Sequence, residues 1–194
     1  MEDAKLLRKL EKEMRKAQDA KRFEHTLGVE FTAAALAMRY SCSVTDAQIA
    51  GVLHDCAKCL SDEKRLKICD KNGIPVSDIE RRNPFLLHAK AGAWLAEEKY
   101  GVRNRPEIIN AIRYHTTGRE DMSLLEKIVF VADYIEPGRR HAPNLPEIRR
   151  LAFDDLDRAV LRILEDTLEH LKKNGGEIDP MTETAYRYYR ENVR

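Results

Sequence analysis

Glycine, proline and aromatic residues are all scarce in this sequence of 194 residues. It contains nine glycines and seven prolines, and only 7% of its residues are aromatic. Hydrophobic residues make up 43% of the chain and charged residues 35%. So few turn-forming residues, combined with so much charge, indicate a soluble and strongly helical protein.

Long apolar runs are also missing. The longest, Ala33 to Met38, is far too short to cross a bilayer, and the charged start Met1 to Lys5 lacks the apolar core of a signal peptide. The four cysteines do not make a disulfide framework in a chain of this size, and they suit a reducing compartment. We therefore expect a cytoplasmic protein that has no membrane partner.

Neither sign of charge is in excess. The chain carries 34 basic and 33 acidic residues, which leaves a formal net charge of +1. An overall field this weak gives no case for binding a nucleic-acid polymer or a membrane surface. Any anionic ligand must therefore be held by local positive groups.

The periodicity of the apolar residues is helical almost throughout, and no internal repeat, low-complexity tract or linker is visible. The sequence predicts an all-α fold, a compact helical array that forms a single domain over residues 1–194. A chain of this length can bury a real core. We expect the core at about residues 20–173, with an N-terminal surface helix at 4–20 and a C-terminal helical tail at 174–194.

Capping and breaker residues predict where the helices begin and end. The signals are the capping boxes Thr45–Gln48 and Ser123–Glu126, the N-cap Ser61, and the breakers Gly73, Gly101 and Pro137-Gly138. Beyond the first helix, the expected helices lie at about 23–40, 45–55, 61–73, 85–100, 104–115, 123–136 and 182–194, with one or two long helices over 144–175. The piece between Pro75 and Pro84 is expected to be less regular.

Residues with metal-binding chemistry follow or line the apolar stripes of five of these helices. They occur in the order His25, His54-Asp55, His88, His115 and Asp133. A single buried histidine is commonly a hydrogen-bonded core residue, and a lone His-Asp pair is commonly a simple helix end. Four histidines and two aspartates together indicate a metal site, because each carboxylate buried without a positive partner would cost on the order of several kcal/mol.

Imidazole and carboxylate ligands suit a divalent transition metal such as iron, manganese or zinc, and an aspartate can bridge two ions. Basic residues lie close by in sequence: Lys58 follows His54 by four residues, and Arg139 and Arg140 follow Asp133 across a Pro-Gly turn. They are candidate phosphate clamps. The alternative for each is a solvated surface charge. His141, in a Pro-rich loop, and His170, in the last turn of a helix, are not expected to act as ligands.

The order of these ligands, on separate helices, resembles the HD-domain metal-dependent phosphohydrolases. Several local strings resemble the YqeK branch of that family, and the resemblance runs from about residue 20 to 190. The strings are His25-Thr-Leu-Gly28, His54-Asp55-Cys-Ala-Lys58, His88-Ala-Lys-Ala-Gly92, Tyr114-His115-Thr-Thr-Gly118 and Val131-Ala-Asp133-Tyr-Ile-Glu-Pro137-Gly-Arg139.

This resemblance implies an HD-type fold and a symmetrical hydrolase of diadenosine tetraphosphate that releases two ADP. It also implies a site with one or two divalent metal ions, which we expect to be iron, with manganese as the alternative. It implies catalytic roles for His54, Asp55, Lys58 and Asp133. The implied metal ligands are His25, His54, Asp55 and Asp133, with His88 and His115 holding a second metal or the phosphates. The implied substrate-binding residues are His25, Lys58, His88, Tyr114, His115, Asp133, Arg139, Gly175 and Gly176.

One position departs from the pattern. Asp179 stands where the resemblance leads us to expect a histidine, which weakens the case for a base contact near Gly175 and Gly176. Two other functions stay open at this point. They are an HD-type di-iron oxygenase and a metal-containing nucleotide sensor without turnover. A homodimer is compatible with the sequence, which does not reveal the oligomeric state.

Overall fold

The computed structural model describes residues 2–140, 142 and 144–193, so the expectation for His141 lies outside the described residues. Within them the secondary structure is helical, without a β-strand, and the predicted all-α fold is confirmed. The helices are α1 Glu2–Ala17, α2 Ala20–Arg39, α3 Val44–Leu53, α4 Asp62–Lys71, α5 Asp78–Arg82, the 3₁₀-helix η1 Pro84–Leu87, α6 His88–Lys99, α7 Pro106–Tyr114, α8 Leu124–Ile135, α9 Leu145–Asp154, α10 Leu156–Lys173 and α11 Pro180–Asn192.

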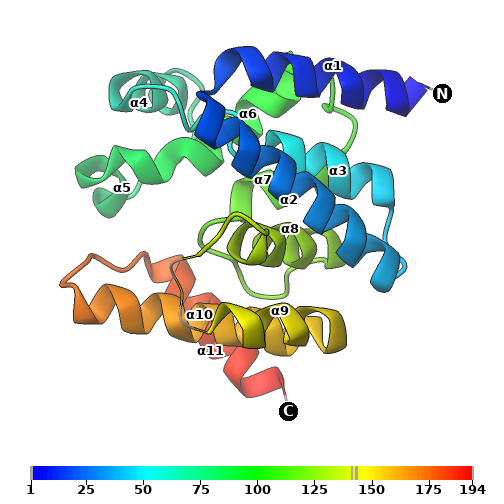
Figure 1. The fold of residues 1–194 in the computed structure, drawn as a ribbon. Helices are drawn as coiled ribbons and strands as arrows, with labels where there is room; N and C mark the ends of the chain where they lie inside the picture. Colours follow the sequence, from blue (N-terminus) through cyan, green and yellow to red (C-terminus); the bar gives the residue numbers. More distant parts are fainter. Residues whose placement is uncertain (1, 141, 143, 194) are drawn as a thin grey trace.

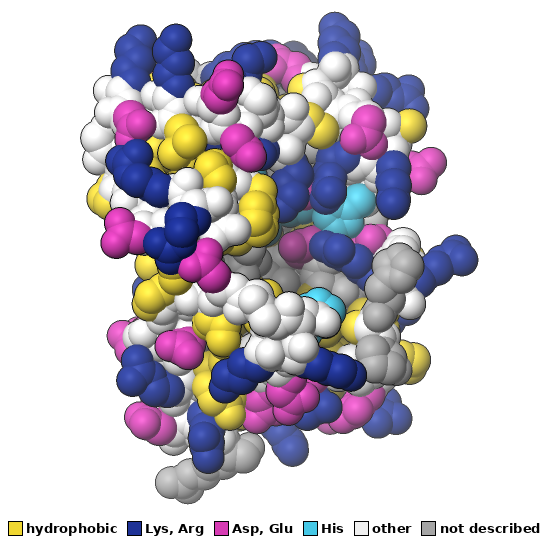
Figure 2. All heavy atoms as spheres, turned by 90° about the vertical axis from the view of Figure 1, so that its left-hand side faces the viewer, with side chains coloured by type: hydrophobic (Ala, Val, Ile, Leu, Met, Phe, Trp, Pro, Cys, Tyr) yellow, Lys and Arg dark blue, Asp and Glu magenta, His cyan; other side chains and the backbone are white. Residues whose placement is uncertain are grey.

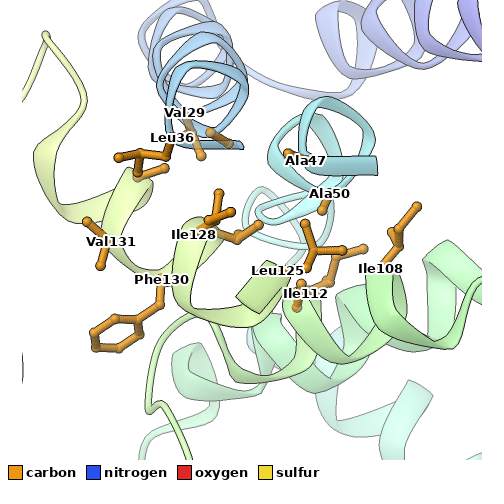
Figure 3. Packing of buried hydrophobic residues seen from close by; sticks show 14 of the residues in the cluster. Val29, Leu36, Ala47, Ala50, Ile108, Ile112, Leu125, Ile128, Phe130 and Val131 are labelled. Carbon is orange, nitrogen blue, oxygen red and sulfur yellow. The ribbon is translucent and has the colours of Figure 1, made fainter. Parts of the chain in front are cut away.

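Helix α8 lies at the centre of the array. It packs against α2, α3 and α7 on one side and against α10 on the other (Figure 1). Figure 3 shows how apolar side chains from α2, α3, α7 and α8 meet between these helices. Ile112 of α7 and Ile128 of α8 are both fully buried there. The predicted ligands lie within, or just beyond, the helices that share this core.

The close packing of α2 against α3 depends on one glycine. A Cβ atom added at Gly51 would lie only 2.9 Å from the Cα atom of Glu30. A methyl group there would push the two helices apart, because backbone atoms cannot move aside as a flexible side chain can. Gly51 therefore sets the distance between the helices that supply His25 and His54.

Several predicted boundaries were displaced by nearby capping residues. The first helix ends at Ala17 instead of residue 20, since the Asp19 side chain accepts from the Arg22 amide and caps α2. The third helix is capped by Ser43, whose hydroxyl accepts from the Asp46 amide, so the predicted capping box at Thr45 is wrong. That helix also ends at Leu53, which leaves His54 as its C-cap and Asp55 in the following turn.

The stretch between Pro75 and Pro84, expected to be less regular, contains the short helix α5 and leads into η1. Ser77 and Glu80 form a reciprocal capping box that starts α5, and Pro84 begins η1. Because η1 occupies residues 84–87, the predicted helix at 85–100 begins as an α-helix only at His88. The capping box at Ser123 and Glu126 is present as predicted.

The chain after α10 folds back along the molecule. Gly175 has a φ of 66°, a conformation that favours glycine, and a Cβ at Gly176 would meet the Leu171 side chain at 2.9 Å. Glu177 then binds Arg82 and Asn83 at the end of α5. Asp179 caps α11. None of the described helices combines the length and the apolar character that crossing a bilayer requires.

A buried carboxyl group on α2 predicts how stability depends on pH. Glu30 is only 1% exposed, and burial raises its pKa from 4.5 to about 7. Its Oε1 accepts from Gln48, whereas no described residue donates to Oε2. The group is neutral in both the folded and unfolded states below pH 4.5. Between pH 4.5 and 7 Glu30 ionises freely only in the unfolded state, so the free energy of unfolding falls as the pH rises.

We expect Glu30→Gln to remove this loss, because the amide keeps the shape but cannot ionise. The free energy of unfolding of the variant minus that of wild type should be roughly 1–3 kcal/mol larger at pH 8 than at pH 5. Urea unfolding at the two pH values measures the difference. Glu24→Gln, an exposed position on the same helix, is the control. An equal effect of Glu30→Gln at both pH values would contradict the expectation.

Candidate metal centre

The six predicted ligands converge from five separate parts of the chain. His25 lies on α2, His54 and Asp55 follow α3, His88 begins α6, His115 follows α7, and Asp133 lies on α8. Three combinations of them, His25-His54-Asp55, His54-His115-Asp133 and Asp55-His88-His115, bring their ligand atoms within 4.8 Å of one another. The structure thus brings together side chains that are more than a hundred positions apart in sequence.

Backbone carbonyls fix the orientation of three of the imidazoles. His54 Nδ1 donates to Gly51 O at 2.6 Å, and His88 and His115 each donate at 2.7 Å to the carbonyl three residues earlier, Phe85 O and Ile112 O. A carbonyl oxygen only accepts, so each Nδ1 carries the proton. In the neutral ring, Nε2 then presents a lone pair to the centre.

The Nε2 atoms meet in two close pairs, and His25 Nε2 also lies 3.0 Å from Asp133 Oδ1. His54 Nε2 lies 3.2 Å from His25 Nε2, and His88 Nε2 lies 3.2 Å from His115 Nε2. Two unprotonated nitrogens repel at this distance unless a cation or a proton lies between them. His54, His88 and His115 are at most 2% exposed, so water does not relieve the repulsion.

Asp55 lies between the two histidine pairs. Its Oδ2 is 3.5 Å from His54 Nε2, and its Oδ1 is 3.4 Å from His88 Nε2 and 3.6 Å from His115 Nε2. Oδ1 is buried and accepts no hydrogen bond from any described residue. A buried carboxylate oxygen surrounded by imidazole lone pairs is the donor set that a divalent transition metal prefers. The residues present therefore fit the expected metal.

The pKa values of His88, Asp55 and Asp133 keep these three groups in the forms that bind a metal. Burial, followed by the nearby charge of Lys58, lowers the pKa of His88 to about 3. Burial opposes ionisation of Asp55 and Asp133, but the surrounding imidazoles, with Arg139 beside Asp133, outweigh it and hold the pKa of each carboxyl below its ordinary value. Neutral imidazole and ionised carboxylate are the forms that bind a metal.

Glu136 is a residue that the sequence analysis missed. Its Oε1 lies 3.1 Å from His25 Nδ1, so it orients the one histidine that no backbone carbonyl holds. Glu136 is 4% exposed, and a Cβ at Gly28 would lie 2.4 Å from its Oε2. A carboxylate behind a ligating histidine is a common outer partner in metal sites. Its place three residues after Asp133, directly after the end of α8, was the available signal.

Three cations surround the centre. Arg22 Nη1 binds Asp55 Oδ2 at 2.7 Å and Arg139 Nη2 binds Asp133 Oδ1 at 2.6 Å. Lys58 Nζ lies 3.1 Å from His88 Nε2, and Lys58 itself lies beyond the end of α3. Arg22, like Glu136, was not predicted. It lies three residues before His25 on α2, and that spacing was the signal.

Two cavities flank the centre and share Thr116. The α8–α10 cavity, of about 1060 Å³, is lined by His115, Asp133 and Arg139 among others. The α6–α11 cavity, of about 490 Å³, is lined by Tyr114 and by residues of α6 and α11. Figure 2 faces the side on which α5 and the α10–α11 turn lie, and a hollow crosses it between the upper and lower halves of the molecule. Gly175 and Gly176 are not among the residues that line these two cavities.

Comparison with known proteins agrees with this geometry. The HD domain family model matches residues 22–138. The chain is 40% identical over 167 residues to the symmetrical bis(5'-nucleosyl)-tetraphosphatase of Bacillus subtilis, covering 86% of this chain and 88% of the relative. It is 35% identical over 171 residues to the Staphylococcus aureus protein of the same name, with 87% of each covered.

A solved structure is similar over nearly the whole chain. A crystal structure from Clostridium acetobutylicum, described as a predicted HD superfamily hydrolase involved in NAD metabolism, has a TM-score of 0.91 and 40% identity. The match covers 95% of this chain and 96% of that one. The chain therefore belongs to the HD-domain family and, within it, to the branch that contains the symmetrical bis(5'-nucleosyl)-tetraphosphatases.

The arrangement predicts that Asp55 is needed for metal binding. We expect Asp55→Ala to lose most of its bound metal while it keeps its helical content, because both carboxylate oxygens face the imidazoles and the helices do not depend on them. Elemental analysis and circular dichroism of the purified protein measure the two quantities. Glu63→Ala, at an exposed position on α4, is the matched control. Full metal content in Asp55→Ala would rule out the site.

Proposed function

We propose that this protein is a metal-dependent hydrolase that cleaves diadenosine tetraphosphate symmetrically into two ADP. The observation that carries the proposal is the convergence of four imidazoles and two carboxylates whose ligand atoms face one another, with cations at its edge. The names of the relatives support the reaction, because two proteins that align with most of this chain are symmetrical bis(5'-nucleosyl)-tetraphosphatases.

The residues that would hold the metal are His25, His54, Asp55, His88, His115 and Asp133. Asp55 has one oxygen toward each histidine pair, which supports a site for two ions. We propose iron, with manganese as the alternative. When bound, such an ion supplies Lewis acidity, which lowers the pKa of water and offsets negative charge on phosphate oxygens.

The cations of the chain would bind the phosphates. Arg139 and Arg22 contact carboxylates of the centre while 44% and 30% of their side chains stay exposed, so their remaining donors can reach a phosphate. Lys58 forms no salt bridge within the described part of the chain, and burial lowers its pKa from the ordinary value. Its ammonium group therefore gains more than the others from an arriving polyphosphate.

In the reaction, water adds to one of the two central phosphorus atoms and the bond from that atom to the central bridging oxygen breaks. Both products are ADP, and the protons released pass to solvent. Negative charge grows on the oxygen that leaves, so donors already in position next to it lower the barrier. Lys58 and Arg139 are the residues placed to provide such donors.

The products formed from diadenosine tetraphosphate test the proposed reaction. With iron or manganese added, we expect ADP as the only nucleotide product. In water enriched in oxygen-18, half of the ADP should carry one labelled oxygen, because one water is consumed for each pair. Mass spectrometry of the products measures both. Formation of ATP and AMP would exclude symmetrical cleavage, and tight ADP binding without turnover would favour a sensor.

Replacing one basic side chain at a time tests which residues bind the phosphates. We expect Lys58→Ala and Arg139→Ala each to lower kcat/KM by roughly 10²-fold while metal content stays unchanged, since each removes a donor from a poorly solvated site. Arg150→Ala, an exposed arginine on α9, should change kcat/KM by less than about threefold. Wild-type rates in Lys58→Ala and Arg139→Ala would show that their charges are only surface charges.

A further inference from the structure

The α6–α11 cavity has the composition of a nucleoside site. Leu86, Tyr114 and Met181 give it apolar and aromatic walls, and Thr117 and Thr184 add hydroxyl groups. The exposed fraction of Met181 is 37%, which is high for a large apolar side chain at a cavity. A flat base can pack against such walls while the hydroxyls bind ribose or the base edge.

The charges of this cavity are balanced, unlike those expected for a phosphate site. Three acidic side chains, Glu80, Glu120 and Asp179, line it together with three basic ones, Lys90, Arg113 and Arg119. Two of the basic groups are already paired within the protein. Lys90 Nζ binds Glu80 at 2.8 Å, and Arg119 Nη2 binds Glu126 at 2.9 Å.

An uncharged end of a ligand, such as a nucleoside, therefore suits this cavity better than the polyphosphate of that ligand does. The Arg119 guanidinium also lies 5.2 Å from the centroid of the Tyr114 ring, so its charge interacts with an aromatic face of the protein as well as with Glu126. Lys58 and Arg139, the groups proposed to bind phosphate, lie instead at the metal centre. Their partners there, His88 and Asp133, are themselves proposed metal ligands.

Thr116 connects this cavity to the metal centre. Its Oγ1 lies 3.1 Å from both His88 Nε2 and His115 Nε2, and the residue lines both cavities. A ligand that entered both cavities would have to pass the centre at Thr116. The middle of such a ligand, and not one end of it, would then lie at the metal ligands.

Building on the proposed function, we propose that the α6–α11 cavity binds one nucleoside of the substrate and the α8–α10 cavity binds the other. The tetraphosphate then spans the metal centre between them. This arrangement explains symmetrical cleavage physically, because two anchored ends place the midpoint of the phosphate chain at the ligands. Specificity for a substrate with two nucleosides would thus depend on α11, which lies outside residues 22–138 matched by the HD domain model.

The turn before α11 holds that helix against the cavity. Glu177 Oε1 accepts from Arg82 at 3.0 Å, and Asp179 Oδ1 caps Met181 at 2.8 Å. Thr117 Oγ1 lies 3.5 Å from the Met181 sulfur, so the first turn of α11 contacts the segment that follows α7. Met181 is therefore a positioned part of the cavity wall.

Met181→Trp tests the assignment, because the larger side chain fills the α6–α11 cavity without touching the metal ligands. The variant is assayed with two compounds, diadenosine tetraphosphate, which has two nucleosides, and adenosine 5'-tetraphosphate, which has one. We expect kcat/KM to fall by at least about 10-fold for the first and to change by less than about threefold for the second, which can use the other cavity. Glu183→Trp, exposed on the same turn of α11, is the matched control and should affect neither substrate.

Equilibrium dialysis of the metal-loaded protein against ADP gives a second readout that needs no turnover. Wild type should bind two ADP per chain at saturation and Met181→Trp should bind one. One ADP per wild-type chain, or equal losses of kcat/KM on both substrates, would overturn the two-cavity assignment even if hydrolysis is symmetrical. Two ADP per chain without hydrolysis of either substrate would instead refute the proposed function and leave the assignment standing.

Discussion

Repulsion between imidazole lone pairs is the constraint on which the centre depends. His54 faces His25, and His88 faces His115, each pair with 3.2 Å between the Nε2 atoms. Backbone carbonyls hold the protons of His54, His88 and His115 on the opposite side of the rings, whereas His25 contacts a carboxylate from each nitrogen, Glu136 at Nδ1 and Asp133 at Nε2. Lys58 Nζ and Thr116 Oγ1, each 3.1 Å from His88 Nε2, offset part of this repulsion. A metal ion bound between the rings would offset the rest, so metal binding and local stability are coupled.

The ends of the helices supply this geometry. The last carbonyls of a helix have no partner within it, and Gly51 O and Ile112 O, near the ends of α3 and α7, are each used by a histidine three residues later. The same interaction that completes the helix end therefore orients the ligand. Close packing of α2 on α3 at Gly51 then brings these ends to one point, because the core between the helices leaves little freedom to shift.

Charge is distributed unequally around this point. Arg22 and Arg139 contact the aspartates of the centre, whereas the basic residues Lys90 and Arg119 of the α6–α11 cavity are paired with glutamates. A metal ion bound by the aspartates would neutralise them, so that Arg22, Arg139 and Lys58 would leave a positive field at the centre, whereas the field of the α6–α11 cavity stays balanced. The physical difference between the two regions is local, since the net charge of the whole chain is only +1.

The sequence by itself determined the helical class and which histidines and aspartates are candidate ligands, because apolar periodicity and the attached histidines and aspartates are local properties. The capping box at Ser123 was predictable for the same reason. Competition between neighbouring caps was not, and Ser43 replaced the predicted start at Thr45. Only the tertiary structure decided that Glu136 orients His25, that Arg22 reaches Asp55, and that two cavities meet at Thr116. Those relations join residues from different helices, and their distances depend on packing that no single segment encodes.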